Sequence, residues 1–351
     1  MNRSRPVGRA AAAAVLTGLV FAVSPSAVHA DAGRVTAGDD GFASTTSVGL
    51  HNTYERAKYD RLTDALDAGS SLIEIDVWTN VAGPGWRVSH SNPVGSDSNC
   101  SNGSMSMQLT GDPDQGLGDC LSDLRVWHDA NPGHRPITVK LELKDGFTAG
   151  FARGPADLDL LLRNRLGDAL FRPAALVGDS GRTLDDAVRA DGWPTREAMA
   201  GTFMIELIPG TVEESNPLDD LWSDREYALH LRQLAAAGQL DRAAAFPAVH
   251  RAQAGDPRAR YEQPLRPWFV VFDGDAAAYA DGGIDTGWYR DNHYLLVMTD
   301  AHSVAPPIAS VAPTEAQARA RVAELAARSA SIVTSDWTAV PTVLSEVVPR
   351  G

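Results

Sequence analysis

Short apolar runs alternate with helical windows along most of the chain, and this alternation constrains the fold more than any other feature of the sequence. The expected strands are "SVGLHN" (47–52), "LIEIDVW" (72–78), "WRVSH" (86–90), "PITVKLEL" (136–143), "TFMIEL" (202–207), "WFVVFD" (268–273), "YLLVMTD" (294–300) and "SIVTSD" (331–336). The expected helical windows are 61–69, 156–170 and 314–330, the last with Thr314 as its N-cap.

Strands that alternate with helices are joined by crossovers and therefore run parallel. About eight such strands predict an α/β fold of the (β/α)₈ TIM barrel type, regular or distorted. A doubly wound open sheet is the alternative, but the chain has no G-x-G-x-x-G after its first strand. The segments 91–120 and 208–266 are rich in Gly, Pro, Asp and Ser, which predicts long elaborated loops.

The first thirty residues have the pattern of a secretory signal peptide. Three arginines precede an apolar stretch from about residue 10 to residue 23, and Val28-His29-Ala30 follows as a small-residue cleavage site. We therefore expect cleavage near Ala30 and a secreted protein with a single catalytic barrel domain at 31–351. The apolar stretch is too short to span a bilayer, and we expect no later transmembrane segment.

Charge and cysteine content narrow the classes of partner and of stabilising bond. The formal net charge is −14, so the chain lacks the excess of lysine and arginine that nucleic-acid binding requires. We expect a monomer with no nucleic-acid partner. In an exported protein the two cysteines, Cys100 and Cys120, are expected to form a disulfide, which in the chain-entropy model contributes roughly 3 kcal/mol.

Polar residues capable of chemistry fall at or just beyond the ends of the first four expected strands. His51 and Asn52 end the first strand, and Glu74 and Asp76 lie two residues apart on the second. Side chains two apart in a strand share a face, so these two acids need a cation between them. His90, Glu142 and Lys144 end the next two strands. The carboxyl ends of barrel strands form the rim where active sites are built.

The residue types at this rim predict phosphodiester cleavage. The oxygens of Asn52, Glu74, Asp76 and Glu142 are hard ligands that suit Ca²⁺ or Mg²⁺. Two histidines beside such a metal can divide the transfer of protons, and Lys144 offers a point charge for a phosphate oxygen. Metal, lysine and two histidines together stabilise charge at phosphorus and move protons across it.

The chain resembles the secreted bacterial family of calcium-dependent phosphatidylinositol-specific phospholipases C. The residues that carry the resemblance are "LHNTY" (50–54), "LIEIDVW" (72–78), "WRVSH" (86–90), "DCLSDLRVWHDANPGHRPITVKLELKD" (119–145) and "DGWPTREAMAGTFMIEL" (191–207). The resemblance implies a phospholipase C barrel that cuts between phosphorus and the diacylglycerol oxygen at a membrane interface, with attack by the inositol 2-hydroxyl and a cyclic inositol phosphate as first product.

The resemblance also implies the roles of individual residues. His51 and His90 would be the catalytic pair, with His90 protonating the leaving alkoxide and His51 stabilising charge at phosphorus or acting as base. Asn52, Glu74, Asp76 and Glu142 would bind the Ca²⁺ cofactor, and Lys144 would contact the substrate phosphate. Independently of the resemblance, the strand pattern offers Arg87, Asp273, His302 and Trp337 as rim candidates for holding the inositol ring. Aromatic residues of the long loops, Trp222, Trp268, Trp288 and Tyr289, are candidates for insertion into lipid, with core packing as the favoured role of Trp268.

Two other functions fit parts of the same pattern. A glycerophosphodiester phosphodiesterase or a sphingomyelinase D-like lipase also uses histidines and a Glu-x-Asp pair on a barrel, but Asn52 directly after His51 and the fourth oxygen ligand, Glu142, favour the phospholipase C arrangement. A secreted calcium-binding module without turnover would be expected to lack one histidine of the pair, and both are present.

Overall fold

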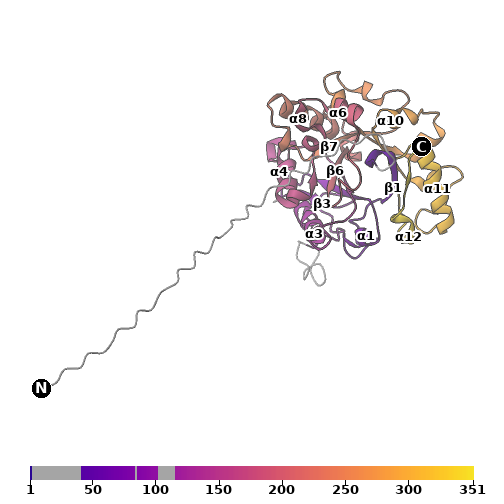
Figure 1. Cartoon of the computed structure of the whole chain (residues 1–351), viewed down its shortest axis with the longest axis horizontal. Helices are drawn as coiled ribbons and strands as arrows, with labels where there is room; N and C mark the ends of the chain where they lie inside the picture. Colours follow the sequence, from indigo (N-terminus) through magenta and orange to yellow (C-terminus); the bar gives the residue numbers. More distant parts are fainter. Residues whose placement is uncertain (2–40, 84, 102–114) are drawn as a thin grey trace. The chain divides into compact units, whose positions relative to one another are not determined.

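A computed structural model of the chain describes residues 41–83, 85–101 and 115–351, together with Met1. The predicted signal peptide and its cleavage site near Ala30 lie outside these ranges, so export stays a prediction. Over the described residues the fold is a mixed α/β barrel with a mostly parallel sheet, as the alternation of strands and helices predicts (Figure 1).

Eight parallel strands follow one another in chain order around the barrel: β1 (Thr45–Leu50), β2 (Leu72–Trp78), β4 (Ile137–Leu143), β6 (Phe203–Pro209), β7 (Ala245–His250), β8 (Val271–Asp275), β9 (Leu295–Thr299) and β10 (Ile332–Ser335). Within the described residues, β1 and β2 do not form a ladder. They meet through the Ser71 amide, which donates to the Val48 carbonyl at 2.8 Å. A Cβ on Gly49 would lie 2.5 Å from the Leu72 Cβ, so only glycine permits this close approach. The barrel is therefore distorted at this seam.

Helices cover the outside of the barrel (Figure 1). They are α1 (Asp64–Asp67), α3 (Leu117–Ala130), α4 (Pro155–Leu166), α5 (Pro173–Val177), α6 (Leu184–Asp191), α7 (Thr211–Ser215), α8 (Ser223–Ala236), α9 (Ala276–Asp281), α10 (Gly287–Asp291), α11 (Glu315–Ala327) and α12 (Pro341–Leu344). Thr314 caps α11 as predicted, since its hydroxyl accepts from the Gln317 amide. Between β7 and β8 the described chain forms 3₁₀ turns at Pro257–Arg260 and Arg266–Trp268, a second departure from a regular barrel.

Two sequence-based expectations about the strands are wrong. The "WRVSH" run contributes only β3 (Arg87–Val88), which pairs antiparallel with the end of β2 in a hairpin and is not a barrel strand. The segment 208–266 is not one long loop, because it contains α7, α8 and the fifth barrel strand, β7. The strand β7 reads "AFPAVH", and its alanines and proline are poor strand formers, so neighbouring strands impose the extended conformation.

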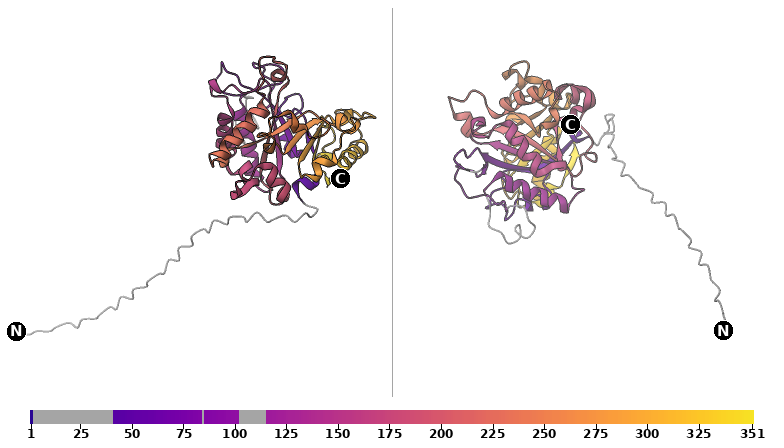
Figure 2. Two further views of the ribbon diagram at one scale, coloured as in Figure 1. Left: turned by 90° about the horizontal axis from the view of Figure 1, so that it is seen from above. Right: turned by 90° about the vertical axis from the view of Figure 1, so that its left-hand side faces the viewer.

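The end of the chain closes the sheet beside its first strand. β11 (Val347–Pro349) pairs antiparallel with β1, with Thr45 opposite Pro349 and Ser47 opposite Val347. Arg350 then donates to the carbonyls of Ala43 and Tyr294 at 2.9 Å. The yellow C-terminal segments accordingly lie beside the indigo first strand in both views (Figure 2).

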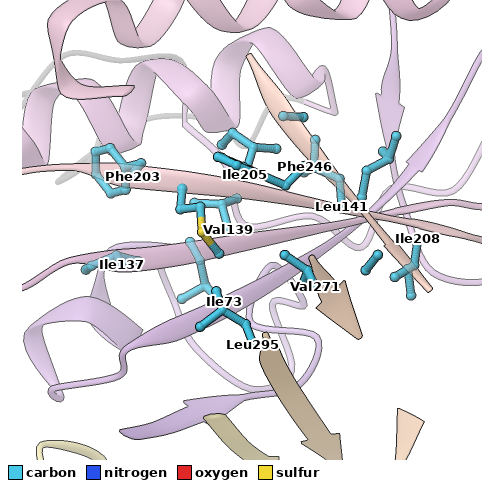
Figure 3. Packing of buried hydrophobic residues seen from close by; sticks show 14 of the residues in the cluster. Ile73, Ile137, Val139, Leu141, Phe203, Ile205, Ile208, Phe246, Val271 and Leu295 are labelled. Atoms are coloured by element: carbon cyan, nitrogen blue, oxygen red, sulfur yellow. The ribbon is translucent and has the colours of Figure 1, made fainter. Parts of the chain in front are cut away.

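Side chains alternate between the two faces of the barrel strands, and this alternation positions the site. In β2 the hydrophobic residues Ile73 and Ile75 belong to the buried core, which gathers the side chains of neighbouring strands (Figure 3). Glu74 and Asp76 point to the opposite face, into the barrel. Trp268 is buried in the core, as expected, whereas Tyr289, a candidate for lipid insertion, is also buried there and so is not available to lipid.

Candidate active site

Three acids from two adjacent strands form the centre of the site. β2 and β4 pair in parallel with Asp76 opposite Glu142, so both side chains share the inner face at the carboxyl end of the strands. One carboxylate oxygen each from Glu74, Asp76 and Glu142 lies within 4.8 Å of the others. The structure thus brings together three of the four residues that the sequence suggests as calcium ligands.

The fourth, Asn52, lies at the end of the first strand and offers an oxygen without a hydrogen-bond donor. Its backbone is left-handed, with φ 50°, and its side chain is 3% exposed. Among the described residues, Asn52 Oδ1 and Asp76 Oδ1 are buried and receive no hydrogen bond, while Asp76 Oδ2 faces the Lys144 ammonium at 3.1 Å. Burying such oxygens without donors is costly. A hard cation satisfies these oxygens, so the residues present fit Ca²⁺.

The electrostatics of the acid cluster also favour a cation. Burial, together with the nearby Glu142 carboxylate, raises the pKa of Asp76 to about 8 even though Lys144 opposes the shift. The Lys144 ammonium lies 3.1 Å from Asp76 Oδ2 and 2.8 Å from Glu142 Oε1. Burial alone would lower the pKa of Lys144, but Asp76 and Glu142 raise it, so the ammonium stays charged. A positive charge therefore lies directly beside the metal candidates.

His51 is held by an acid that the sequence did not suggest. Its Nδ1 lies 3.2 Å from Asp336 Oδ1, and Lys58 Nζ lies 2.6 Å from the same oxygen. Its Nε2 lies 3.9 Å from Glu74 Oε2. Burial alone would lower the pKa of His51, but Glu74 and Asp336 raise it to about 9. Burial would raise the pKa of Asp336, but its hydrogen bonds with His51 and Lys58 lower it, so this carboxylate stays ionised.

His90 comes from the hairpin after β2 and reaches the loop that carries His51. The His90 side chain is 49% exposed, and its Nδ1 lies 3.5 Å from Glu55 Oε1, four residues beyond His51. The segment after His90 is attached to the same loop, because Glu55 and Ser98 form a β-bridge and the side-chain Nδ2 of Asn99 donates to the Thr53 carbonyl. Both histidines thus border one stretch of the barrel rim.

The predicted disulfide between Cys100 and Cys120 is present. It ties the end of the His90 segment to helix α3. The neighbouring Ser101 reinforces this attachment, since its amide donates to Asp123 Oδ2 at 2.6 Å and its hydroxyl to Oδ1 at 3.1 Å. The bond therefore restrains the part of the chain that presents His90.

A charged layer inside the barrel supports the acid cluster from below. Lys140 lies opposite both Glu74 and Glu206 on the adjacent strands, and its Nζ lies 3.4 Å from Glu74 Oε1 and 3.0 Å from Asp273 Oδ2. Burial raises the pKa of Glu206 well above its usual value, which keeps that carboxyl protonated beside its charged neighbours. Lys140 lies two residues before Glu142 and therefore on the same face of the strand, so the sequence alone could have predicted that Lys140 points into the barrel.

The proposed ring-binding candidates have different environments. Arg87 donates to the Gly95 carbonyl at 3.0 Å and so braces the loop that follows His90. Trp337 is fully buried. His302 Nδ1 lies 3.0 Å from the Ser335 hydroxyl at the end of β10. Asp273 is buried in the middle of β8, where His250 Nδ1 lies 3.2 Å from its Oδ1. The sequence reading did not identify His250, because it lies on the strand that was predicted as loop.

Comparisons with known proteins point to one family. The model of the family described as phosphoinositide phospholipase C, Ca²⁺-dependent, matches residues 110–248. A solved Ca²⁺-dependent phosphatidylinositol-specific phospholipase C enzyme from Streptomyces antibioticus is 57% identical to this chain. The match covers 89% of this chain and 99% of that chain, with a TM-score of 0.87. No match was found among curated proteins.

A more distant structure shares the fold. A calcium-dependent phosphoinositol-specific phospholipase C from a Pseudomonas species, solved in an apo form as a myoinositol complex, is 19% identical. The match covers 89% of this chain and 96% of that chain, with a TM-score of 0.66. At this identity the likeness supports the distorted barrel and nothing finer.

Proposed function

Because the chain belongs to the calcium-dependent phosphatidylinositol-specific phospholipase C family, we propose that the rim formed by β1, β2 and β4 carries out that family's reaction, with His51 and His90 as its catalytic pair. The chain is a calcium-dependent phosphodiesterase that acts on phosphatidylinositol. The roles of individual residues are the part that we propose. Two observations carry them: Asn52 Oδ1 and Asp76 Oδ1 are buried without a hydrogen-bond donor from the described residues, and Glu74 of the same acid cluster lies 3.9 Å from His51 Nε2.

Asn52, Glu74, Asp76 and Glu142 would hold the calcium. When bound, the ion supplies positive charge for the phosphate and for the oxygen that attacks it. Lys144 adds a second positive charge at a phosphate oxygen, because its ammonium lies at the mouth of the same acid cluster.

The two histidines divide the proton transfers. The Asp336 carboxylate accepts from His51 Nδ1–H, which leaves His51 Nε2 free for the substrate. The neutral form of His51, which is favoured when a bound cation offsets the Glu74 charge that raises its pKa, takes the proton of the inositol 2-hydroxyl at Nε2 while that oxygen forms a bond to phosphorus. The bond between phosphorus and the diacylglycerol oxygen breaks, and His90 donates the proton that this oxygen needs to leave. The products are diacylglycerol and a cyclic inositol phosphate, so atoms and charge balance.

Exposed apolar side chains on the same rim support docking on a lipid surface. Five of them lie in the segments that connect the carboxyl ends of barrel strands to the following long helices or strands: Val81, Phe151, Val212, Leu218 and Val311. Leu218 is 92% exposed and Phe151 61% exposed, which is unusual for side chains of this size unless they meet an apolar partner. No helix in the described part of the chain is long and apolar enough to cross a membrane. We propose that the enzyme acts as a monomer, secreted after cleavage near Ala30, that approaches lipid through this rim.

The decisive experiment for the reaction is a calcium titration of phosphatidylinositol cleavage with the water-soluble product identified by phosphorus NMR. We expect turnover to rise from zero with calcium and a cyclic phosphate to appear first. His51→Ala and His90→Ala should each remove nearly all turnover while calcium binding persists. Release of choline from glycerophosphocholine or sphingomyelin, in place of inositol phosphate, would overturn the assignment.

A paired substitution tests the lipid surface. Leu218→Ser and Phe151→Ser should weaken sedimentation with phosphatidylcholine vesicles, because each removes an exposed apolar side chain from the rim. Leu160→Ser is the control, since Leu160 is 51% exposed on helix α4 and away from the loops of the rim. Equal vesicle binding by all three variants and the wild type would exclude the rim as the docking surface.

A further inference from the structure

His250, at the carboxyl end of β7, forms a hydrogen-bonded pair with Asp273 in the middle of the adjacent strand β8. β7 and β8 run parallel with His250 opposite Asp273, and His250 Nδ1 lies 3.2 Å from Asp273 Oδ1. The Asp273 side chain is fully buried, whereas the His250 side chain is 24% exposed. The pair therefore joins the interior of the barrel to its rim, and the imidazole is the part that reaches solvent.

The carboxylate fixes which imidazole nitrogen is free. An ionised carboxylate can only accept, so His250 Nδ1 carries the hydrogen and donates it to Asp273. Burial would raise the pKa of Asp273, but Lys140 and the hydrogen bond from His250 lower it, so it stays ionised. His250 Nε2 is thus left to accept a hydrogen bond from a hydroxyl group when the ring is neutral, or to donate one when it is protonated.

One buried ammonium group connects this pair to the acid cluster. Lys140 Nζ contacts Asp273 Oδ2 at 3.0 Å and Glu74 Oε1 at 3.4 Å. Glu74 and Asp273 therefore lie on either side of a single lysine inside the barrel. His250 ends β7 and Lys144 directly follows β4, so both residues border the same mouth of the barrel, two strands apart in the sheet.

We infer that His250 is a specificity-determining residue whose Nε2 hydrogen-bonds a ring hydroxyl of the inositol headgroup, with Asp273 and Lys140 holding the imidazole in place. The inference rests on the proposed function, and it assigns the binding of the inositol ring to the part of the rim at the end of β7. A polyol is the matching ligand class, because its hydroxyls both donate and accept and so pair with an imidazole of fixed tautomer. A site built to hold a hydroxyl discriminates strongly against analogues that lack it.

A further His–Asp pair, remote from the rim, serves as a matched control. His230 Nε2 lies 2.8 Å from the buried Asp159 Oδ2, and this histidine stands on the outer helix α8. If His250 only served as the hydrogen-bond partner of a buried carboxylate, replacing His250 and replacing His230 should have the same effect on substrate discrimination. His230→Ala should therefore leave substrate discrimination unchanged, whatever it does to stability.

The test measures kcat/KM for phosphatidylinositol and for analogues that each lack one ring hydroxyl other than the 2-hydroxyl. We expect His250→Ala to lower kcat/KM on phosphatidylinositol about 10- to 100-fold, mainly through KM. For the analogue that lacks the hydroxyl bound by His250, the wild type should show a similar drop in kcat/KM relative to phosphatidylinositol. His250→Ala should cleave that analogue and phosphatidylinositol with equal kcat/KM. His250→Gln, which keeps a polar group at the position, should recover part of the discrimination.

The outcomes separate this inference from the proposed function. If wild type and His250→Ala discriminate equally among all analogues, His250 does not read the headgroup, although phosphatidylinositol cleavage itself stands. If the wild type cleaves no phosphatidylinositol with calcium supplied, the proposed function fails first. Circular dichroism melting and calcium titration of each variant show that a loss of activity is not a loss of fold or of the metal site.

Discussion

His51 Nδ1 lies 3.2 Å from Asp336 Oδ1, although 285 positions separate the two residues along the chain. The pairing of β1 with β10 creates this contact, because the two strands run parallel with Leu50 opposite Ser335 and each is followed at once by the interacting residue. The hydrogen bond from the ring to an ionised carboxylate fixes the tautomer of His51. Asp336 is therefore a positioning residue for the proposed catalytic histidine.

Asp336→Asn should lower kcat on phosphatidylinositol about 100-fold, because a neutral amide neither fixes the tautomer nor stabilises the imidazolium. The pKa of His51, about 9 in the cation-free protein, should fall because one of the charges that raise it is gone. NMR titration of the His51 ring, together with kcat at saturating calcium, measures both effects. Asp275→Asn is a matched control at the end of β8, where Asp275 only caps helix α9. Similar losses in the two variants would contradict a specific role for Asp336.

Calcium should stabilise the fold through Asn52 Oδ1 and Asp76 Oδ1, which are buried and receive no hydrogen bond from the described residues. At a calcium concentration 100 times Kd, linkage predicts a gain of about 2.7 kcal/mol in the free energy of unfolding. Chelation should reverse this gain and abolish turnover. Asp76→Asn should remove most of the gain, yet the cation-free variant should unfold at a higher temperature than the cation-free wild type, because it no longer buries a carboxylate beside Glu142. Calcium-independent melting of the wild type would refute the metal site.

The alternation of side chains in β2 and β4 explains why much of the site could be predicted from sequence. Glu74 and Asp76 must share a face, and residues at strand ends must share the rim, whatever the exact register. The distances within the cluster depend on register, which places Asp76 opposite Glu142 and which spacing alone does not give.

The residues that the sequence reading missed have a common physical cause. His250 follows a strand of alanine and proline whose extended form is imposed by its neighbours, so the residue seemed to lie in a loop. Asp336 ends a strand that was predicted, but its role depends on contact with β1 at the far end of the chain. Tertiary pairing, and not local propensity, determines both positions.

Glu213 should make stability depend on pH. Burial raises the pKa of Glu213 to about 9, even though hydrogen bonds from the Ser223 amide and hydroxyl oppose the shift. Between its ordinary value of 4.5 and about 9, the unfolded chain loses this proton while the folded chain keeps it. This residue's contribution to the free energy of unfolding should therefore fall as pH rises through that window, by up to about 1.4 kcal/mol per unit, and level off above it.

Glu213→Gln should remove this slope, because an amide keeps the acceptor for the Ser223 amide and has no proton to lose. Urea unfolding at pH 5, 6, 7 and 8 gives the slope for wild type and variant. Glu197→Gln is the control, since Glu197 is exposed and should leave the pH dependence unchanged. Parallel pH profiles for wild type and Glu213→Gln would show that this carboxyl titrates normally in the folded protein.

The disulfide should matter for both stability and turnover, because it fastens the segment that presents His90 to helix α3. Cys100 and Cys120 are 20 positions apart, and closing a loop of that size contributes roughly 3 kcal/mol in the chain-entropy model. The double variant Cys100→Ser/Cys120→Ser should lose about that much free energy of unfolding in urea. The Ser101–Asp123 hydrogen bonds remain as a second attachment, so kcat should fall only several-fold. Reducing the wild type should reproduce both effects. A variant that loses stability but keeps full kcat would show that His90 is positioned by its contact with Glu55 and not by the bond to α3.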